Sequence, residues 1–244
     1  SLNDSIPNED SRDIQLDIGN LFQANRYPGI DRVENGSRIS YGIQVGAFSD
    51  TLGNSGFLAL GQSFRFSGTD IFPEGSGLTD DLSDIVGQMN ITVRDRYYLD
   101  YRIQFDHETL DDERHELQGS FRQGPLDLRL AYLFARQLEG TGLSDNRQQI
   151  SSEAALRLNE KWALLGGIRQ DLTGEAGLLE SSVGVRYKNC CFSFRLEADR
   201  DLTNIDSGGG GSSIVFSIGL RNLGGFDEPL LDDDNTMFGV FEDN

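Results

Sequence analysis

The 244-residue sequence contains little cysteine, proline or histidine, and it lacks any apolar run long enough to form a membrane-spanning helix. Such a helix needs about 20 consecutive apolar residues. Basic residues are scarce as well, because 40 acidic residues stand against 21 basic ones and the net charge is −19. A surface that binds nucleic acid carries a basic footprint. We therefore expect no nucleic-acid partner.

Catalytic and metal-binding patterns are also scarce. The two histidines, His107 and His115, flank the acidic loop HETLDDERH, and their spacing matches no known metal site. The glycine-rich run SGGGGSS (207–213) lacks the strand-to-helix context of a phosphate-binding loop. We therefore expect no enzyme, no cofactor and no metal site.

The two cysteines, Cys190 and Cys191, are neighbours in the stretch YKNCCFSF. Adjacent cysteines do not easily bond to each other, because the ring would strain both the disulfide and the peptide. The residues themselves leave two states open. Either both cysteines bond to partners elsewhere, or both are inert thiols.

What the sequence has in quantity is strict alternation of apolar and polar residues. In RISYGIQVGAF (38–48), Ile39 and Tyr41 fall on one face, and Ser40 and Gly42 fall on the other. A period of two residues predicts a strand with one apolar face. The pattern predicts no helix and eleven strands, at 38–48, 57–66, 85–94, 97–106, 115–122, 126–134, 149–158, 162–170, 179–187, 191–199 and 213–221. We expect an all-β, antiparallel fold.

The connections between the predicted strands alternate in length. Short turns fall at 95–96, 123–125, 159–161 and 188–190, and long links fall at 67–84, 107–114, 135–148, 171–178 and 200–212. The link 49–56 is an exception of moderate length. Outer-membrane barrels have short periplasmic turns and long extracellular loops. The alternation therefore favours such a barrel.

Charged residues of the predicted strands all fall on the polar face. A charge that faces lipid at the middle of a bilayer costs about 2–4 kcal/mol, whereas a soluble sheet tolerates occasional exceptions. We therefore predict a transmembrane β-barrel, with a large soluble β-protein as the alternative. The arginines expected to face the barrel lumen are Arg65, Arg94, Arg102, Arg122, Arg129, Arg157, Arg169, Arg186, Arg195 and Arg221.

The odd strand number conflicts with a closed barrel. Bacterial single-chain barrels have an even number of strands, and an open edge in lipid would leave backbone groups unpaired. We expect these residues to be the C-terminal part of a longer barrel, whose other strands precede Ser1. A missed strand at 12–18 is the competing explanation, because RDIQLDI also alternates.

Three segments that lie far apart in the chain are distinctive. They are IGNLFQANRYPGIDRVENGSRISYGI (18–43), the cysteine pair with its aromatic neighbour in CCF (190–192), and the closing segment IVFSIGLRNLGG (214–225). Together they resemble the C-terminal barrel region of LptD, the lipopolysaccharide-assembly family of the Gram-negative outer membrane. The three segments occur in the order of the family and span nearly the whole chain.

The resemblance implies an architecture. LptD-like barrels have 26 strands, so the eleven strands predicted here would be a C-terminal portion. We expect residues 1–37 to be an extracellular loop segment that leads into the barrel, and residues 38–223 to hold the barrel strands. The acidic residues 224–244 match nothing in the family and are expected to be a disordered periplasmic tail.

The resemblance also implies site residues and partners. In LptD-like proteins the adjacent cysteines form disulfides with cysteines of an N-terminal periplasmic domain, so Cys190 and Cys191 would bond upstream. The partners would be an LptE-type lipoprotein that plugs the lumen and an LptA-type periplasmic bridge that supplies lipopolysaccharide. The last strand would form one side of a lateral gate, through its residues Ile214, Phe216, Ile218 and Leu220.

The function implied is insertion of lipopolysaccharide into the outer leaflet of the outer membrane, with a diffusion porin or another outer-membrane barrel as the alternative. The lumen-facing arginines have two interpretations of their own. They pair with inward carboxylates on neighbouring strands, which we favour, or they guide the acidic head group of the lipid.

Overall fold

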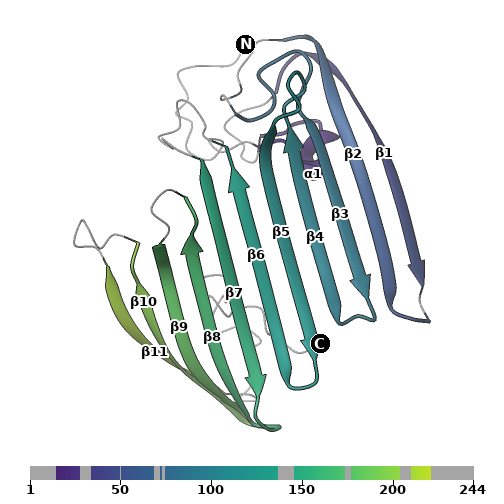
Figure 1. Cartoon of the computed structure of the whole chain (residues 1–244). Coiled ribbons are helices and arrows are strands. Elements are labelled where there is room, and N and C mark those ends of the chain that lie inside the picture. Colours follow the sequence, from purple (N-terminus) through teal and green to yellow (C-terminus); the bar gives the residue numbers. More distant parts are fainter. Residues whose placement is uncertain are drawn as a thin grey trace. The chain divides into compact units, whose positions relative to one another are not determined.

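The computed structural model describes residues 15–27, 34–49, 51–68, 72, 75–136, 146–173, 177–203 and 210–220. Eleven antiparallel strands form one sheet in chain order (Figure 1). They are β1 (Ser37–Ser49), β2 (Asn54–Ser67), β3 (Ile85–Val93), β4 (Tyr97–Phe105), β5 (Asp112–Gln123), β6 (Leu126–Ala135), β7 (Arg147–Arg157), β8 (Trp162–Asp171), β9 (Gly177–Lys188), β10 (Phe192–Asp201) and β11 (Gly211–Leu220). The prediction of eleven strands is confirmed.

One short helix, α1 (Ile18–Leu21), precedes the sheet. Asp17 caps it, because its side chain accepts the backbone N–H of Asn20 while the Asn20 side chain accepts the backbone N–H of Asp17. The sequence predicted no helix, and the competing idea of a strand at 12–18 is wrong for residues 15–17, which lie outside any strand. Among the described residues, no helix has the length and apolarity to cross a membrane.

Two compact units divide the chain. The first comprises residues 1–117 and 133–148, and it contains α1 and β1–β4. The second comprises residues 118–132 and 149–244, and it contains β8–β11. A small hydrophobic core belongs to the first unit and is made of Leu16, Leu21, Tyr27, Phe72, Leu78 and Val86.

The link between β1 and β2 is shorter than the sequence indicated. Ser49 pairs with Asn54, so the ladder continues past the apolar alternation and leaves only 50–53 as a turn. The prediction of a moderate link at 49–56 was wrong, because polar residues at the strand ends pair through their backbones. The remaining short turns are 94–96, 124–125, 158–161 and 189–191.

The two faces of the strands differ as the alternation predicted. Large apolar side chains on one face are exposed, and Ile43 of β1 and Ile214 of β11 are 74% and 77% accessible. Other exposed members of this apolar face are Tyr41, Val45, Leu58, Leu60, Phe64, Phe66, Trp162, Leu164, Ile168, Val183, Phe216 and Ile218. Water does not favour such a surface, and contiguous apolar patches mark contact with a membrane or a partner.

Candidate functional site

Residues 15–27 lie against the polar face of β1–β4. The Ser40 hydroxyl donates to the Leu21 carbonyl over 2.9 Å, and the Arg38 guanidinium donates to the Gln23 carbonyl. Gln15 Nε2 donates to Gln104 Oε1 of β4 over 2.9 Å. The polar face of this unit is therefore occupied by a segment of the same chain that precedes its first strand.

Glycine leaves the space that this segment fills. A Cβ atom on Gly61 of β2 would come within 2.3 Å of Leu21 Cδ2, and a Cβ on Gly42 of β1 within 3.3 Å of Phe22 Cζ. Leu21 is fully buried. Because Gly42 and Gly61 are cross-strand partners, the two glycines together form a shallow seat for α1.

Charged and aromatic contacts hold the C-terminal part of the segment. The Glu34 carboxylate pairs with Arg26 and, over 2.8 Å, with Arg38. The side chains of Arg26 and Glu34 are only 3% and 4% accessible. Tyr27 stacks on Phe72 with ring centroids 5.2 Å apart. A buried pair of this kind stays charged only when its partners satisfy each other, so breaking it would release the segment.

A cavity of about 210 Å³ lies between residues 15–18 and parts of β3, β4 and β5. Its wall combines backbone and polar side chains of both, including Gln15, Asp17, Gln88, Arg102, Arg114 and Glu116. Arg114 and Glu116 pair with each other, and Arg102 pairs with Asp100 over 3.1 Å. The cavity is therefore lined by both positive and negative side chains, and such a lining can accommodate a small polar molecule.

Most of the predicted lumen-facing arginines form ion pairs with carboxylates. Arg122 and Arg157 both reach Asp127 of β6, over 3.2 and 3.6 Å. Arg195 pairs with Glu197 over 2.8 Å, and Arg169 pairs with Glu180, its direct cross-strand partner. Arg65 lies 3.5 Å from Asp81. Arg122, Arg157 and Arg169 thus pair with carboxylates of a neighbouring strand, as the first interpretation expects. Arg195 instead pairs within its own strand, and Asp81 lies outside the strands.

The other predicted arginines are placed differently. Arg94 lies in the turn after β3, with a φ of 55°, and not within the strand. Arg129 has a favourable electrostatic interaction with the Glu153 carboxylate. Arg186 is the cross-strand partner of Arg195 in the β9–β10 ladder. Arg221 lies outside the described residues.

The cysteine pair lies in the short turn between β9 and β10. Asn189 Oδ1 accepts the backbone N–H groups of Cys191 and Phe192 over 2.8 and 2.9 Å, which closes the turn. Both thiols are exposed, and their sulfur atoms are 2.9 Å apart. The contact with Cys190 raises the pKa of the Cys191 thiol. The strand was expected to begin at residue 191, but β10 begins at Phe192, so the turn itself presents the pair.

The predicted gate strand is β11, and it ends the ladder beside β10. Ile214, Phe216, Ile218 and Leu220 alternate along its apolar face and are all more than half accessible. Phe216 packs edge-on against Phe194 of β10, with ring centroids 5.1 Å apart. Among the described strands, β11 pairs with β10 alone, so its other edge can accept a further strand.

The two histidines do not form a common site. His115 packs among Tyr101, Phe105 and Phe134, and its Nδ1 lies 2.7 Å from the Tyr101 hydroxyl. His107 instead lies beside Asp84, which comes from a different loop. Burial raises the pKa of the Asp84 carboxyl, and backbone hydrogen bonds from Thr109 and Glu108 lower that of Asp106. Sequence reasoning missed this grouping because Asp84 is remote from His107 along the chain.

Comparison with known proteins provides an independent view of the chain. The family described as LPS transport system D (LptD) matches residues 2–162. Proteins named LPS-assembly protein LptD are similar to the chain: one from Alcanivorax borkumensis is 27% identical over 91% of the chain, and one from Shewanella oneidensis is 26% identical over 88%. A third, from Aeromonas salmonicida, is 26% identical over 80% of the chain.

The match covers a limited part of these relatives. The chain spans 29% of the length of the Alcanivorax protein, 30% of the Shewanella protein and 25% of the Aeromonas protein.

Proposed function

The chain belongs to the LptD family, and from this premise we propose that it forms part of the transmembrane barrel that places lipopolysaccharide in the outer leaflet of the outer membrane. The observation that carries the proposal is the family match over residues 2–162, which coincides with strands that expose one apolar face. An apolar face of that kind suits lipid, and it needs no further protein layer to cover it.

The proposal assigns a place to each part of the chain. Residues 38–223 hold the barrel strands, the short turns face the periplasm and the long loops face outward. Residues 1–37 lead into β1 from the outer side, and their part 15–27 lies against the polar face of β1–β4. The predicted acidic periplasmic tail, 224–244, lies outside the described residues. The edges of the sheet, β1 and β11, pair with strands outside these residues, because unpaired backbone in lipid costs several kcal/mol per group.

The proposed partners follow the same scheme. An LptE-type lipoprotein would fill the lumen and meet the arginine–carboxylate pairs of the polar face. An LptA-type bridge would deliver lipopolysaccharide through a domain outside this chain. The lipid would leave beside β11, past Ile214, Phe216, Ile218 and Leu220. No catalytic step is required, because the lipid is moved without a change in its covalent bonds.

Disulfides from Cys190 and Cys191 to upstream cysteines would tether the periplasmic domain to this end of the barrel. Two features support the assignment: both thiols are exposed, and they lie in a short turn. The periplasm is oxidising, so such bonds form and persist there. A pair of bonds from one tight turn would fix the direction in which the domain enters the barrel.

The test is depletion of the full-length protein in the bacterium that encodes it. We expect newly made lipopolysaccharide to accumulate inside and to disappear from the cell surface, measured by its accessibility to an antibody that does not enter the cell. Re-expression of the full-length protein should restore surface lipopolysaccharide. Unchanged surface lipopolysaccharide, together with a loss of small-solute uptake, would instead identify a diffusion porin.

A further inference from the structure

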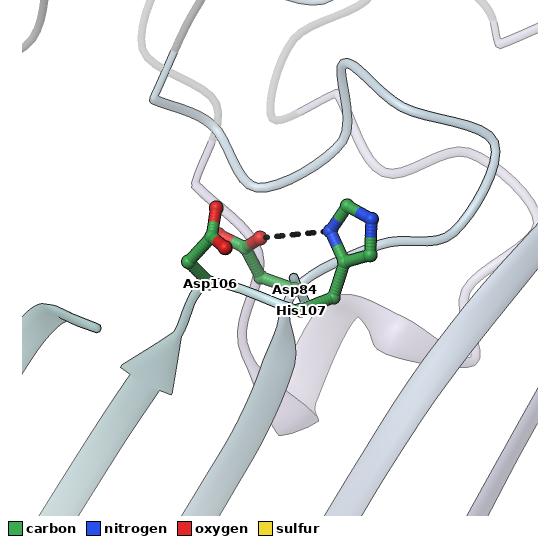
Figure 2. A group of neighbouring side chains, drawn as sticks. All are labelled: Asp84, Asp106 and His107. Carbon is green, nitrogen blue, oxygen red and sulfur yellow. Dashed lines mark ion pairs between the residues drawn. The ribbon is translucent and has the colours of Figure 1, made fainter. Parts of the chain in front are cut away.

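Three metal-ligating side chains meet where β3 begins and β4 ends. Asp84 directly precedes β3, and Asp106 and His107 directly follow β4. The two strands are antiparallel neighbours, so these ends of the hairpin are adjacent. One ligand atom from each side chain lies within 4.8 Å of the other two (Figure 2). The group therefore draws on two loops that the sequence keeps apart.

The Asp84 carboxylate is buried and held in place. Asp84 is 8% accessible, and its Oδ2 accepts the Gln104 amide over 2.7 Å. Gln104 is itself 2% accessible and is fixed from the other side by Gln15. Asp84 Oδ1 faces His107 Nδ1 at 3.8 Å. Partners that orient a carboxylate in this way are typical of the outer shell of metal sites.

The other two ligands are also positioned. Asp106 Oδ1 accepts the backbone N–H groups of Glu108 and Thr109 over 2.9 and 2.7 Å, which holds the carboxylate against the start of its own loop. The His107 side chain is 10% accessible, and its Nε2 points to Glu108 Oε1 at 3.9 Å. Nδ1 lies on the side of Asp84, where it can bind a metal ion, and Nε2 lies on the side of the exposed Glu108 carboxylate.

The two carboxylates of the group have little positive charge beside them in the described part of the chain. In the part of the chain that the structure describes, neither Asp84 nor Asp106 forms an ion pair with an arginine or a lysine. The nearby Arg136 is engaged with Asp111 and Glu113, over 3.2 and 3.1 Å. Buried carboxylates are normally paired with a fixed cation or coordinate a metal. Among the described residues, His107 is the one basic side chain within 4.0 Å of either carboxylate.

We propose that Asp84, Asp106 and His107 bind a divalent transition-metal cation, of which Zn²⁺ fits the donor set best. One imidazole nitrogen and two carboxylate oxygens are donors that Zn²⁺ accepts, with a fourth position for water. Ca²⁺ and Mg²⁺ prefer oxygen alone. The cation would join the loop that precedes β3 to the loop that follows β4. The proposal is independent of the function assigned above.

The test measures Zn²⁺ binding to the full-length protein, purified in detergent with its disulfides intact and stripped of metal by a chelator. Zn²⁺ alone is titrated in competition with a chromophoric chelator. We expect His107→Gln to weaken one binding site at least 100-fold, since loss of a mere outer-shell partner costs 10–100-fold. The matched control is His115→Gln, which removes the other histidine of the chain and should leave the affinity unchanged.

A second variant tests the site without removing a metal ligand. Gln104→Leu removes the hydrogen bond to Asp84 Oδ2 without removing a ligand, and it should weaken Zn²⁺ binding about 10- to 100-fold. Gel migration of unheated samples checks that each variant is folded. Equal Zn²⁺ affinity in the wild-type protein, His107→Gln and His115→Gln would overturn the proposal and leave His107 as a neighbour of Asp84 without a role in metal binding. Selective binding of Ca²⁺ over Zn²⁺ would overturn it as well.

Discussion

Gly61 decides how closely α1 approaches β2. Its missing side chain leaves room for Leu21, which is fully buried there. The same residue type serves a different purpose in the turns, where Gly53 and Gly124 adopt φ values of 58° and 57°. A sequence with 29 glycines does not reveal which of them make room and which of them bend the chain.

Gly61→Val should therefore detach residues 15–27 from the sheet. Overpacking costs about 1–3 kcal/mol, so we expect the protected backbone amides of this segment to exchange with solvent roughly tenfold faster or more. Hydrogen exchange of the full-length protein, followed by mass spectrometry, measures this. Gly56→Val is the control, since a Cβ on Gly56 of the same strand meets nothing within 4 Å. Equal protection of 15–27 in both variants would contradict the contact.

Asn189 fixes the turn that carries the cysteine pair. Its side chain closes the turn through two backbone N–H groups, and Asn159 does the same in the turn before β8, where it accepts from Lys161 and Trp162. The two turns are thus matched, except that one carries cysteines. This allows the effect of turn geometry to be separated from the effect of stability.

Asn189→Ala should slow the formation of disulfides by Cys190 and Cys191, whereas Asn159→Ala should not. Asn159→Ala removes two hydrogen bonds and Asn189→Ala removes three, the third being a longer one of 3.4 Å from Asn189 Nδ2 to the Tyr187 hydroxyl. At about 1 kcal/mol for each bond, the two changes should lower stability by comparable amounts. Non-reducing gels of newly made full-length protein follow the oxidation. Equal oxidation rates in the two variants would show that the turn does not pre-organise the thiols.

Within the strands, the ion pairs of the polar face differ in how deeply they are buried. Arg195 and Glu197 are 17% and 5% accessible, whereas Arg122 and Asp127 are 54% and 15% accessible. An exposed pair contributes about 0–1 kcal/mol, and breaking a buried one costs about 3–5 kcal/mol because it leaves a charge without a partner. The ion pairs of the polar face should therefore contribute unequally to the stability of the protein.

Arg195→Met should thus destabilise the protein several-fold more than Arg122→Met. The measurement is the urea concentration at the midpoint of unfolding, with the full-length protein in detergent. Both variants lose one charge and keep a long side chain, so they are matched in chemistry. Similar midpoints would mean that Glu197 finds another partner in the assembled protein.

The alternation within β11 provides a test of the membrane assignment. Phe216 and Val215 are neighbours with accessibilities of 57% and 46%, but their side chains lie on opposite faces. Val215 faces Glu197 across the ladder, on the polar face. If the apolar face contacts lipid, Phe216→Arg should cost about 2–4 kcal/mol, and Val215→Arg should be tolerated.

Assembly of the two full-length variants in the outer membrane is measured by cell fractionation and by the heat-dependent gel migration of folded barrels. We expect Phe216→Arg to be depleted from the membrane and Val215→Arg to assemble normally. Equal assembly of both would indicate that the apolar face does not contact lipid, as in a soluble β-protein.

At the scale of the whole molecule, the strands were predictable and the contacts between remote segments were not. The period of two residues recurs along each strand, so every strand could be located from local sequence. Strand ends were less certain, because polar residues such as Ser49 and Asn54 pair through backbone groups that carry no sequence signal.

The seat of α1 and the Asp84–Asp106–His107 group lay beyond sequence reasoning for a different reason. Both join residues that only the strand pairing brings together, and neither has a characteristic spacing. The cysteine pair was predictable as a feature, because it is rare and adjacent. Its position within the turn depended on Asn189, whose role is visible only in the structure.

The most direct test of the account is disulfide mapping by mass spectrometry on the full-length protein, taken from outer membranes with free thiols blocked. The account predicts that Cys190 and Cys191 are each bonded to a cysteine far upstream. Free thiols at both positions, or a bond between the two neighbours, would contradict the tether and leave an untethered barrel in its place.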